Sequence, residues 1–135
     1  MIVSNAGPLI HLARISKLKL LKTLFGEVVI PYAVKEEVVE RGKEKGKADA
    51  FLIEEGIKEG WIVTVEDVDM EELAERAGIG LGLEVVGSVG VLIKSAKEYK
   101  ISKEEAFDSL EKLAKVMWLR IDVYEGARKA IEELK

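Results

Sequence analysis

Short apolar runs alternate with longer amphipathic stretches along the first half of the chain. Residues 2–4, 27–30 and 61–65 are rich in β-branched or aromatic side chains, and Gly, Pro or polar residues follow or precede them, which is typical of short buried strands. The segments between them place apolar residues three and four positions apart, as one face of a helix requires. Strands that alternate with helices predict a parallel sheet with helices on both faces.

The predicted helices share this helical spacing and end at glycine, proline or charged residues. We expect them over residues 8–15, 18–25, 32–41, 47–58, a stretch ending near 77, 88–99, 103–117 and 123–134. Ser16 is a candidate N-cap, and Ser102 with Glu105 has the spacing of a capping box. Residues 42–46 are predicted to form a charged turn, and residues 83–86 a further short strand. Together these elements predict a three-layer α/β/α domain over residues 1–135, with a short central parallel sheet.

Composition narrows the class of protein. The chain has 135 residues, no cysteine and a net charge of −4, so a disulfide framework, a thiolate metal site and a thiol nucleophile are excluded. It has no apolar run of membrane-spanning length, which predicts a soluble, cytoplasmic protein. Glutamine is absent and Asn5 is the only asparagine, while Lys and Glu are abundant; this bias is typical of a hyperthermophile's protein.

Asn5 and Glu37 are the first candidates for chemistry. Asn5 follows the first predicted strand and Glu37 lies on the helix after the second, so both belong to the edge where parallel strands end. Amide and carboxylate oxygens are ligands that Mg²⁺ or Mn²⁺ accepts, although one of each makes a weak site alone. The alternative is structural: Asn5 would tether the strand–helix turn through its side chain, and Glu37 would be a solvated helix residue.

Other chemistry-bearing residues have structural interpretations that we favour. The acidic cluster after the third strand is typical of a helix start, and the glycine-rich segment 78–82 lacks the context of a phosphate-binding loop. His11 has no partner in the sequence that would make it part of a hydrolase triad. The basic residues of the first two helices could bind phosphates, but a solvated face is the simpler interpretation. The acidic cluster comprises Glu66, Asp67, Asp69, Glu71 and Glu72, and the basic residues are Arg14, Lys17, Lys19 and Lys22.

Several motifs carry a family resemblance. The chain opens Val-Ser-Asn-Ala-Gly-Pro-Leu-Ile from position 3, continues with Leu-Phe-Gly at 24–26, and reads Val-Val-Ile-Pro-Tyr-Ala-Val-Lys-Glu-Glu over 28–37. Gly-Trp-Ile at 60–62 is a further match, and residues 83–92 resemble a last strand with its helix. With these motifs the chain resembles the PIN-domain superfamily, in the prokaryotic branch that begins V-S-[D/N]-x-x-P-L-I.

The resemblance implies a metal-dependent ribonuclease, and many members of the superfamily are toxins of toxin–antitoxin pairs. It places Asn5 at the first acidic position and Glu37 at the second, with Mg²⁺ or Mn²⁺ as the metal. The remaining acidic positions, on a helix opening G-E-x-E-A and on a strand ending in two Asp, have no counterpart here. The chain therefore looks shortened by one central helix and strand, about 30 residues. Asp67, Asp69 or Glu84 would have to replace the missing ligands.

Two functions follow from this resemblance. The first is a protein of metal-dependent ribonuclease ancestry whose acidic site is incomplete and whose activity is weak or absent. The alternative is a non-catalytic, dimeric module that binds RNA or an antitoxin-like protein. Loss of the strand beside strand one would leave that strand as an edge, and an unpaired edge favours pairing with a second copy. We therefore also expect a homodimer.

Overall fold

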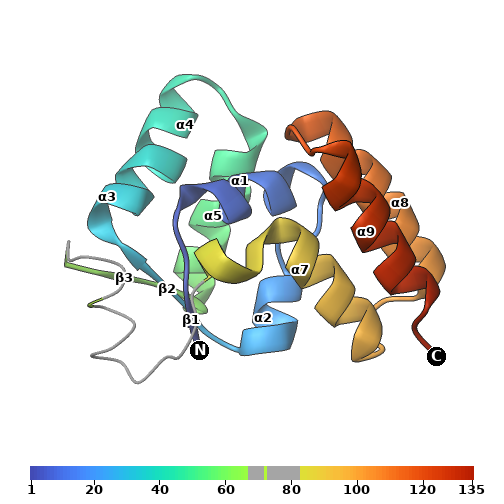
Figure 1. Ribbon diagram of the computed structural model, residues 1–135. Helices are drawn as coiled ribbons and strands as arrows, with labels where there is room; N and C mark the ends of the chain where they lie inside the picture. The colour runs from blue at the N-terminus through green and yellow to red at the C-terminus, as the bar shows by residue number, and fades with distance from the viewer. Residues whose placement is uncertain (67–71, 73–82) are drawn as a thin grey trace.

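The computed structural model describes residues 1–66, Glu72 and 83–135, with only the backbone described over 83–86. Its sheet consists of three parallel strands, β1 (Ile2–Val3), β2 (Val28–Pro31) and β3 (Ile62–Val65), in the order β1-β2-β3. Val28 pairs with Ile2 on one side and with Ile62 on the other. The predicted three-layer α/β/α class with a short parallel sheet is confirmed, and all three of these strands lie where the sequence placed them (Figure 1).

Helices cover the sheet and connect its strands. They are α1 (Ala6–Arg14), α2 (Leu20–Phe25), α3 (Tyr32–Lys35), the π-helix η1 (Glu36–Arg41), α4 (Gly42–Glu44), α5 (Ala48–Glu59), α7 (Leu83–Lys97), α8 (Lys103–Val116) and α9 (Ile121–Glu132). Helices α8 and α9 form a hairpin that packs against α7, on the opposite side of the molecule from the sheet (Figure 1). Within the described part of the chain, no helix combines the length and apolar character that a membrane crossing requires.

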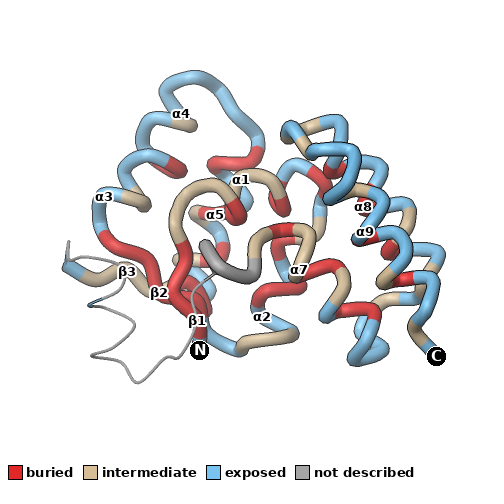
Figure 2. Tube along the Cα trace, viewed as in Figure 1, coloured by how far each residue is buried: buried red, intermediate tan, exposed pale blue. Residues whose placement is uncertain are grey.

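The core forms where the apolar faces of the helices meet the strands. All four residues of β2 are buried, as expected for a central strand covered on both faces. Leu9 and Leu12 of α1, Ile53 of α5 and Leu92 of α7 are fully buried in the same cluster. Figure 2 shows the buried positions concentrated in the strands and on the helix faces turned inward.

Three local predictions are wrong. Residues 83–86 are helical, as the first turn of α7, and the chain then bends at Gly87, whose φ of +70° lies outside the helical region. Residues 42–44 continue the helix that starts at Tyr32 instead of forming a turn. Ser16 has a φ of +59° and does not cap α2, which begins at Leu20 with Lys19 as its N-cap.

The edge of the sheet at β1 does not support dimerisation through strand pairing. Within the described residues β1 pairs with β2 alone, so it is an edge strand as predicted. However, Ile2 and Val3 are only 3% and 1% exposed, so this edge is covered within one chain. A buried edge gives no template for pairing with a second copy. Dimerisation therefore needs support from another surface.

Candidate functional site

Asn5 stands at the predicted position, between the end of β1 and the start of α1. Ser4 before it is fully buried, and its Oγ donates a hydrogen bond to the Asn5 backbone oxygen at 2.9 Å. Asn5 is the N-cap of α1, yet its side chain makes no capping hydrogen bond, so the predicted tether through the side chain is not formed. Its Oδ1 is buried and has no hydrogen-bond partner within the described part of the chain. This oxygen is therefore an unsatisfied buried acceptor.

Glu37 lies on η1, in the middle of the continuous helical stretch 32–44. The π-helical hydrogen bonding places residues five apart above one another, and Arg41 and Glu36 accordingly approach to 3.9 Å. Such π segments inside helices are frequently found at functional sites. Glu37 is exposed, as a solvated helix residue would be, and it also lines a cleft.

This cleft, which we call the cationic cleft, has a volume of about 270 Å³. It opens where α1, η1 with α4, and the start of α5 come together, near the top of Figure 1. Four of its side chains are cationic and two are acidic. Its lining residues are Ile10, Arg14, Glu37, Val38, Arg41, Gly42, Lys45, Lys47 and Asp49.

The positive charge of the cationic cleft is poorly neutralised. Arg14 approaches Asp49 at 3.8 Å from Nε to Oδ1, and Arg41 approaches Glu36 at 3.9 Å, both too long for hydrogen-bonded pairs. Lys45 and Lys47 form no ion pair with the described residues. The cleft therefore favours an anionic ligand, although the whole chain carries a net charge of −4.

The predicted metal ligands do not complete a metal site in the described part of the chain. There, no three His, Cys, Asp or Glu side chains come together as a metal ion would require. Asn5 is not among the residues that line the cleft beside Glu37. Asp67, Asp69 and Glu71, with the glycine segment 78–82, lie outside the described residues, as does the Glu84 side chain. The described oxygens alone do not fit a Mg²⁺ or Mn²⁺ centre, and we derive no catalytic step through a metal.

The remaining basic and titratable candidates lie in different surroundings. Arg14 belongs to the cationic cleft, whereas Lys17 pairs with Glu105 at 3.2 Å. His11 is half-buried on α1; desolvation lowers its pKa below the ordinary value, and the nearby charge of Arg14 lowers that pKa further. No nucleophilic side chain is hydrogen-bonded to it among the described residues, so it is not placed as the base of a nucleophile–base pair.

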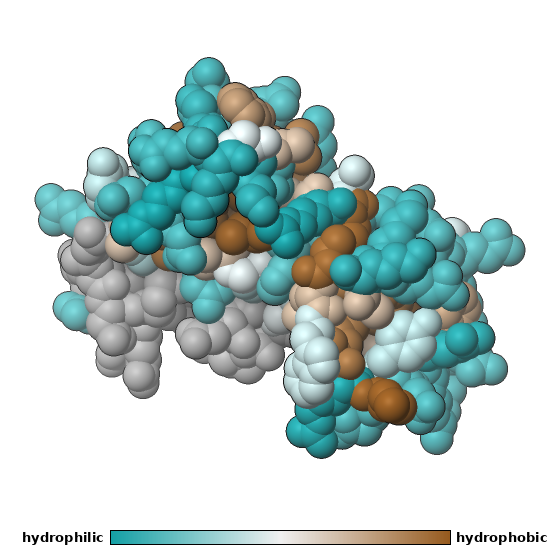
Figure 3. Space-filling model, turned by 90° about the horizontal axis from the view of Figure 1, so that it is seen from above, coloured by the Kyte–Doolittle hydropathy of each residue, from teal (hydrophilic) through white to brown (hydrophobic). Residues whose placement is uncertain are grey.

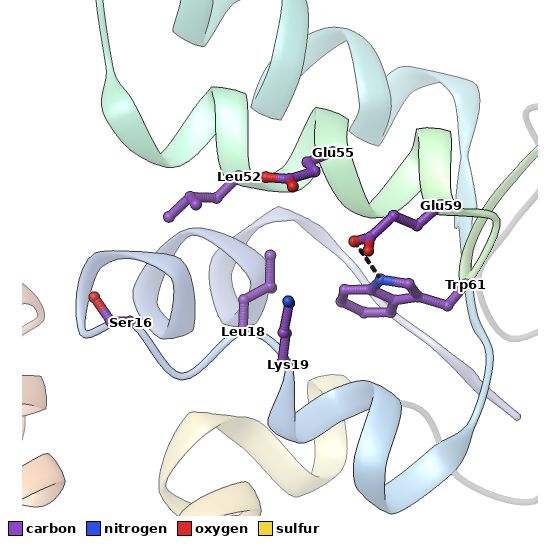
Figure 4. Close-up of a pocket in the computed structure, with 7 residues that line it drawn as sticks. All are labelled: Ser16, Leu18, Lys19, Leu52, Glu55, Glu59 and Trp61. Atoms are coloured by element: carbon purple, nitrogen blue, oxygen red, sulfur yellow. Dashed lines mark hydrogen bonds between the residues drawn. The ribbon is translucent and has the colours of Figure 1, made fainter.

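A second cavity, of about 200 Å³, lies between the α1–α2 connection and α5 (Figure 4). Its floor is apolar, and charged side chains surround its mouth. Glu59 accepts a hydrogen bond from Trp61 Nε1 at 3.4 Å, and Lys19 points into the same space (Figure 4). Its lining residues are Ser16, Leu18, Lys19, Leu52, Glu55, Glu59 and Trp61. No sequence pattern predicts this cavity, because its residues come from two segments, 16–19 and 52–61, that meet only through packing.

Comparison with known proteins identifies the family. The family model described as DUF3368, a PIN domain, matches residues 1–80, which include β1 to β3 and every residue that lines the cationic cleft. The chain therefore belongs to the PIN-domain family. Helices α7, α8 and α9 follow the matched region. Comparisons with curated proteins and with solved structures gave no match.

Proposed function

We propose that this PIN-domain protein has metal-dependent ribonuclease ancestry, binds RNA, and hydrolyses it weakly or not at all. The observation that carries the proposal is the surroundings of Glu37. At the position that the family resemblance assigns to an acidic ligand, Glu37 is accompanied by two arginines and two lysines, and among the described residues Asp49 is the one further carboxylate that lines the cleft. Hydrolysis of a phosphodiester needs enough negative oxygens to hold a metal ion and orient water.

The unpartnered Oδ1 of Asn5 supports descent from a metal-dependent ribonuclease. A buried amide oxygen without a hydrogen bond carries a free-energy cost, which a ligand at that oxygen would remove. PIN domains are as a family dependent on divalent metals, and the family resemblance assigns Asn5 and Glu37 to the metal, although Asn5 does not line the cleft beside Glu37. With two oxygens the affinity for Mg²⁺ or Mn²⁺ would be low.

The test is Mn²⁺ titration by calorimetry, combined with a cleavage assay on single-stranded RNA. The variants are Glu37→Ala and Asn5→Ala, and Glu40→Ala is the matched control because Glu40 is an exposed residue of η1 outside the cleft. We expect no saturable binding below millimolar Mn²⁺ and little or no cleavage. Tight binding with cleavage that Glu37→Ala abolishes and Glu40→Ala preserves would show instead a working nuclease.

The exposed side chains at the α8–α9 turn favour a second candidate, a dimeric interaction module. Trp118 and Ile121 are 80% and 76% exposed and lie three residues apart. Large apolar side chains so exposed are common at protein–protein contacts. Figure 3 views the end of the molecule that carries this turn and α4, where hydrophilic side chains predominate around small apolar areas. Light scattering of the wild type and of Trp118→Ser tests this candidate: a dimer that Trp118→Ser dissociates supports it, and a wild-type monomer contradicts it.

A further inference from the structure

The structure assigns the cationic cleft a specific role: we infer that Arg14, Arg41, Lys45 and Lys47 bind backbone phosphates of single-stranded RNA without a metal ion. The inference rests on the proposed function for the identity of the polymer, and on the cleft itself for the site. Four cations line this cleft of about 270 Å³, whereas within the described part of the chain Lys19 is the one cation that lines the second cavity described above.

The elements that form the cleft bring the positions of these cations together. Gly42 packs so closely against Ala50 that α4 and α5 lie in direct contact, which brings Arg41 beside the start of α5. Lys47 is the N-cap of α5, and this twelve-residue helix has no side-chain cap there. The positive end of its dipole therefore adds to the four side-chain charges. Both arginines can present a planar fork to phosphate oxygens.

The charges in the cleft that oppose an anion are few and identifiable. Asp49 is nearly buried and partly engaged by Arg14 at 3.8 Å, whereas Glu37 has no ion pair with a described residue. Removal of the Glu37 charge should therefore strengthen the binding of phosphate. This is the opposite of what a metal-ligand role predicts, since loss of a metal ligand weakens every metal-dependent contact with RNA.

A single strand fits the surroundings of the cleft better than a duplex does. Phe51 follows Ala50 on α5, and its ring is 52% exposed with Lys43 Nζ 5.7 Å from its centroid. An exposed aromatic ring beside basic residues is the arrangement on which unpaired bases stack while their phosphates are held. The bases of a duplex are already stacked and could not use it.

The experiment measures binding of a fluorescein-labelled, twelve-nucleotide single-stranded RNA by anisotropy in EDTA, over a range of salt concentrations. The cleft variant is Lys45→Glu/Lys47→Glu, and the control is Lys100→Glu/Lys115→Glu on the opposite half of the chain. All four lysines are exposed. Each Lys→Glu substitution changes the charge by −2, so each double variant has a net charge of −8 in place of −4. Circular dichroism confirms that both variants fold.

We expect the cleft variant to lose at least about tenfold in affinity and to lower the slope of log K against log salt by about 1.4, because two phosphate contacts are lost. The control should change affinity by less than about threefold, as expected from a distant surface charge. In the same buffer Glu37→Gln should tighten binding by roughly fivefold, from the removal of one nearby negative charge. Competition by millimolar inorganic phosphate would support phosphate as the recognised group.

Three outcomes would overturn the inference. They are equal losses in the cleft and control variants, no binding of the RNA up to about 100 µM at low salt, and competition by a poly-glutamate peptide as effective as that by unlabelled RNA. Because EDTA removes divalent metal, these outcomes are independent of the Mn²⁺ and cleavage tests. Equal losses in the two variants would overturn this inference alone, whereas absence of RNA binding would also overturn the RNA-binding part of the proposed function. A protein that cleaves RNA with Mn²⁺ could still satisfy or fail this test.

Discussion

Gly42 and Ala50 are in such close contact that a Cβ added at Gly42 would lie 2.7 Å from the Cβ of Ala50. The φ of Gly42, −64°, is ordinary for a helix, so what requires glycine here is the close approach of α4 to α5 and not an unusual backbone conformation. The contact forms one wall of the cationic cleft, since Gly42 and the neighbouring Arg41 both line it.

Gly42→Ala should therefore destabilise the protein and weaken RNA binding. Overpacking typically costs about 1 to 3 kcal/mol, against which the better helix propensity of alanine recovers roughly 1 kcal/mol. We expect a net loss of up to about 2 kcal/mol in urea denaturation. Gly42→Ala/Ala50→Gly provides the control, because the second change removes the clashing methyl. If the two single effects simply add in the double variant, the contact is not the cause.

Much of the fold followed from the sequence because its strands are short, apolar and bounded by breaking residues. The apolar runs at β2 and β3 fit few structures other than strands, because the chain alternates strands and helices. Residues 83–86 are helical although a strand is predicted, because a run of four residues with three apolar side chains suits either structure and is too short for periodicity to distinguish them. A glycine after a helical pattern, such as Gly42, predicts the end of a helix, whereas here its missing side chain permits a tertiary contact.

The candidate site was only partly predictable. Asn5 and Glu37 could be placed because they follow strands, where parallel sheets bring side chains together. The cationic cleft could not, because Arg14, Arg41 and Lys47 belong to three separate segments and meet only through packing. The charged run from 41 to 47 was the one available signal. This charged run resembles an ordinary solvated turn, so its sequence alone does not predict a binding site.

Two helix N-caps, Asn5 and Ser102, should respond differently to substitution by alanine. Ser102 Oγ accepts a hydrogen bond from the Glu105 backbone N–H at 3.0 Å, which confirms the predicted cap. The Glu105 side chain pairs with Lys17 at 3.2 Å, and no bond back to Ser102 is formed. Ser102→Ala should cost about 1 kcal/mol, whereas Asn5→Ala should cost only a few tenths because Asn5 makes no capping bond.

Thermal and urea denaturation of the two alanine variants would check this difference. A large loss for Asn5→Ala would mean that its side chain contributes to stability in a way that the described contacts do not contain.

Ser109 and Ser95 form a matched pair of fully buried serines. Ser95 Oγ donates to the Val91 backbone oxygen at 2.7 Å, while Ser109 Oγ has no partner within the described part of the chain. An unpaired buried hydroxyl costs about 1 to 3 kcal/mol. Ser109→Ala should therefore leave stability unchanged or raise it by up to about 1 kcal/mol, and Ser95→Ala should not stabilise to the same degree. Equal effects of the two substitutions in urea denaturation would contradict this.

His11 should make stability depend on pH in a predictable direction. Desolvation and then Arg14 hold its folded-state pKa below the ordinary value of 6.5, so the unfolded chain binds a proton more readily than the folded one. The contribution of the neutral imidazole to stability is complete above pH 6.5, and it decreases as the pH falls through 6.5 toward the lower folded-state pKa. As the only histidine, His11 gives one imidazole signal whose titration NMR can follow directly.

Two variants test both the size and the cause of this pKa shift. Arg14→Gln should raise the pKa of His11 because it removes the smaller, coulombic contribution, while Lys22→Gln on α2 serves as the control. His11→Asn should remove the part of the pH dependence that lies near and below pH 6.5, measured as the difference in urea midpoint between pH 7.5 and pH 5. A His11 signal that titrates at or above 6.5 in the folded protein would show that α1 does not desolvate the ring as the structure indicates.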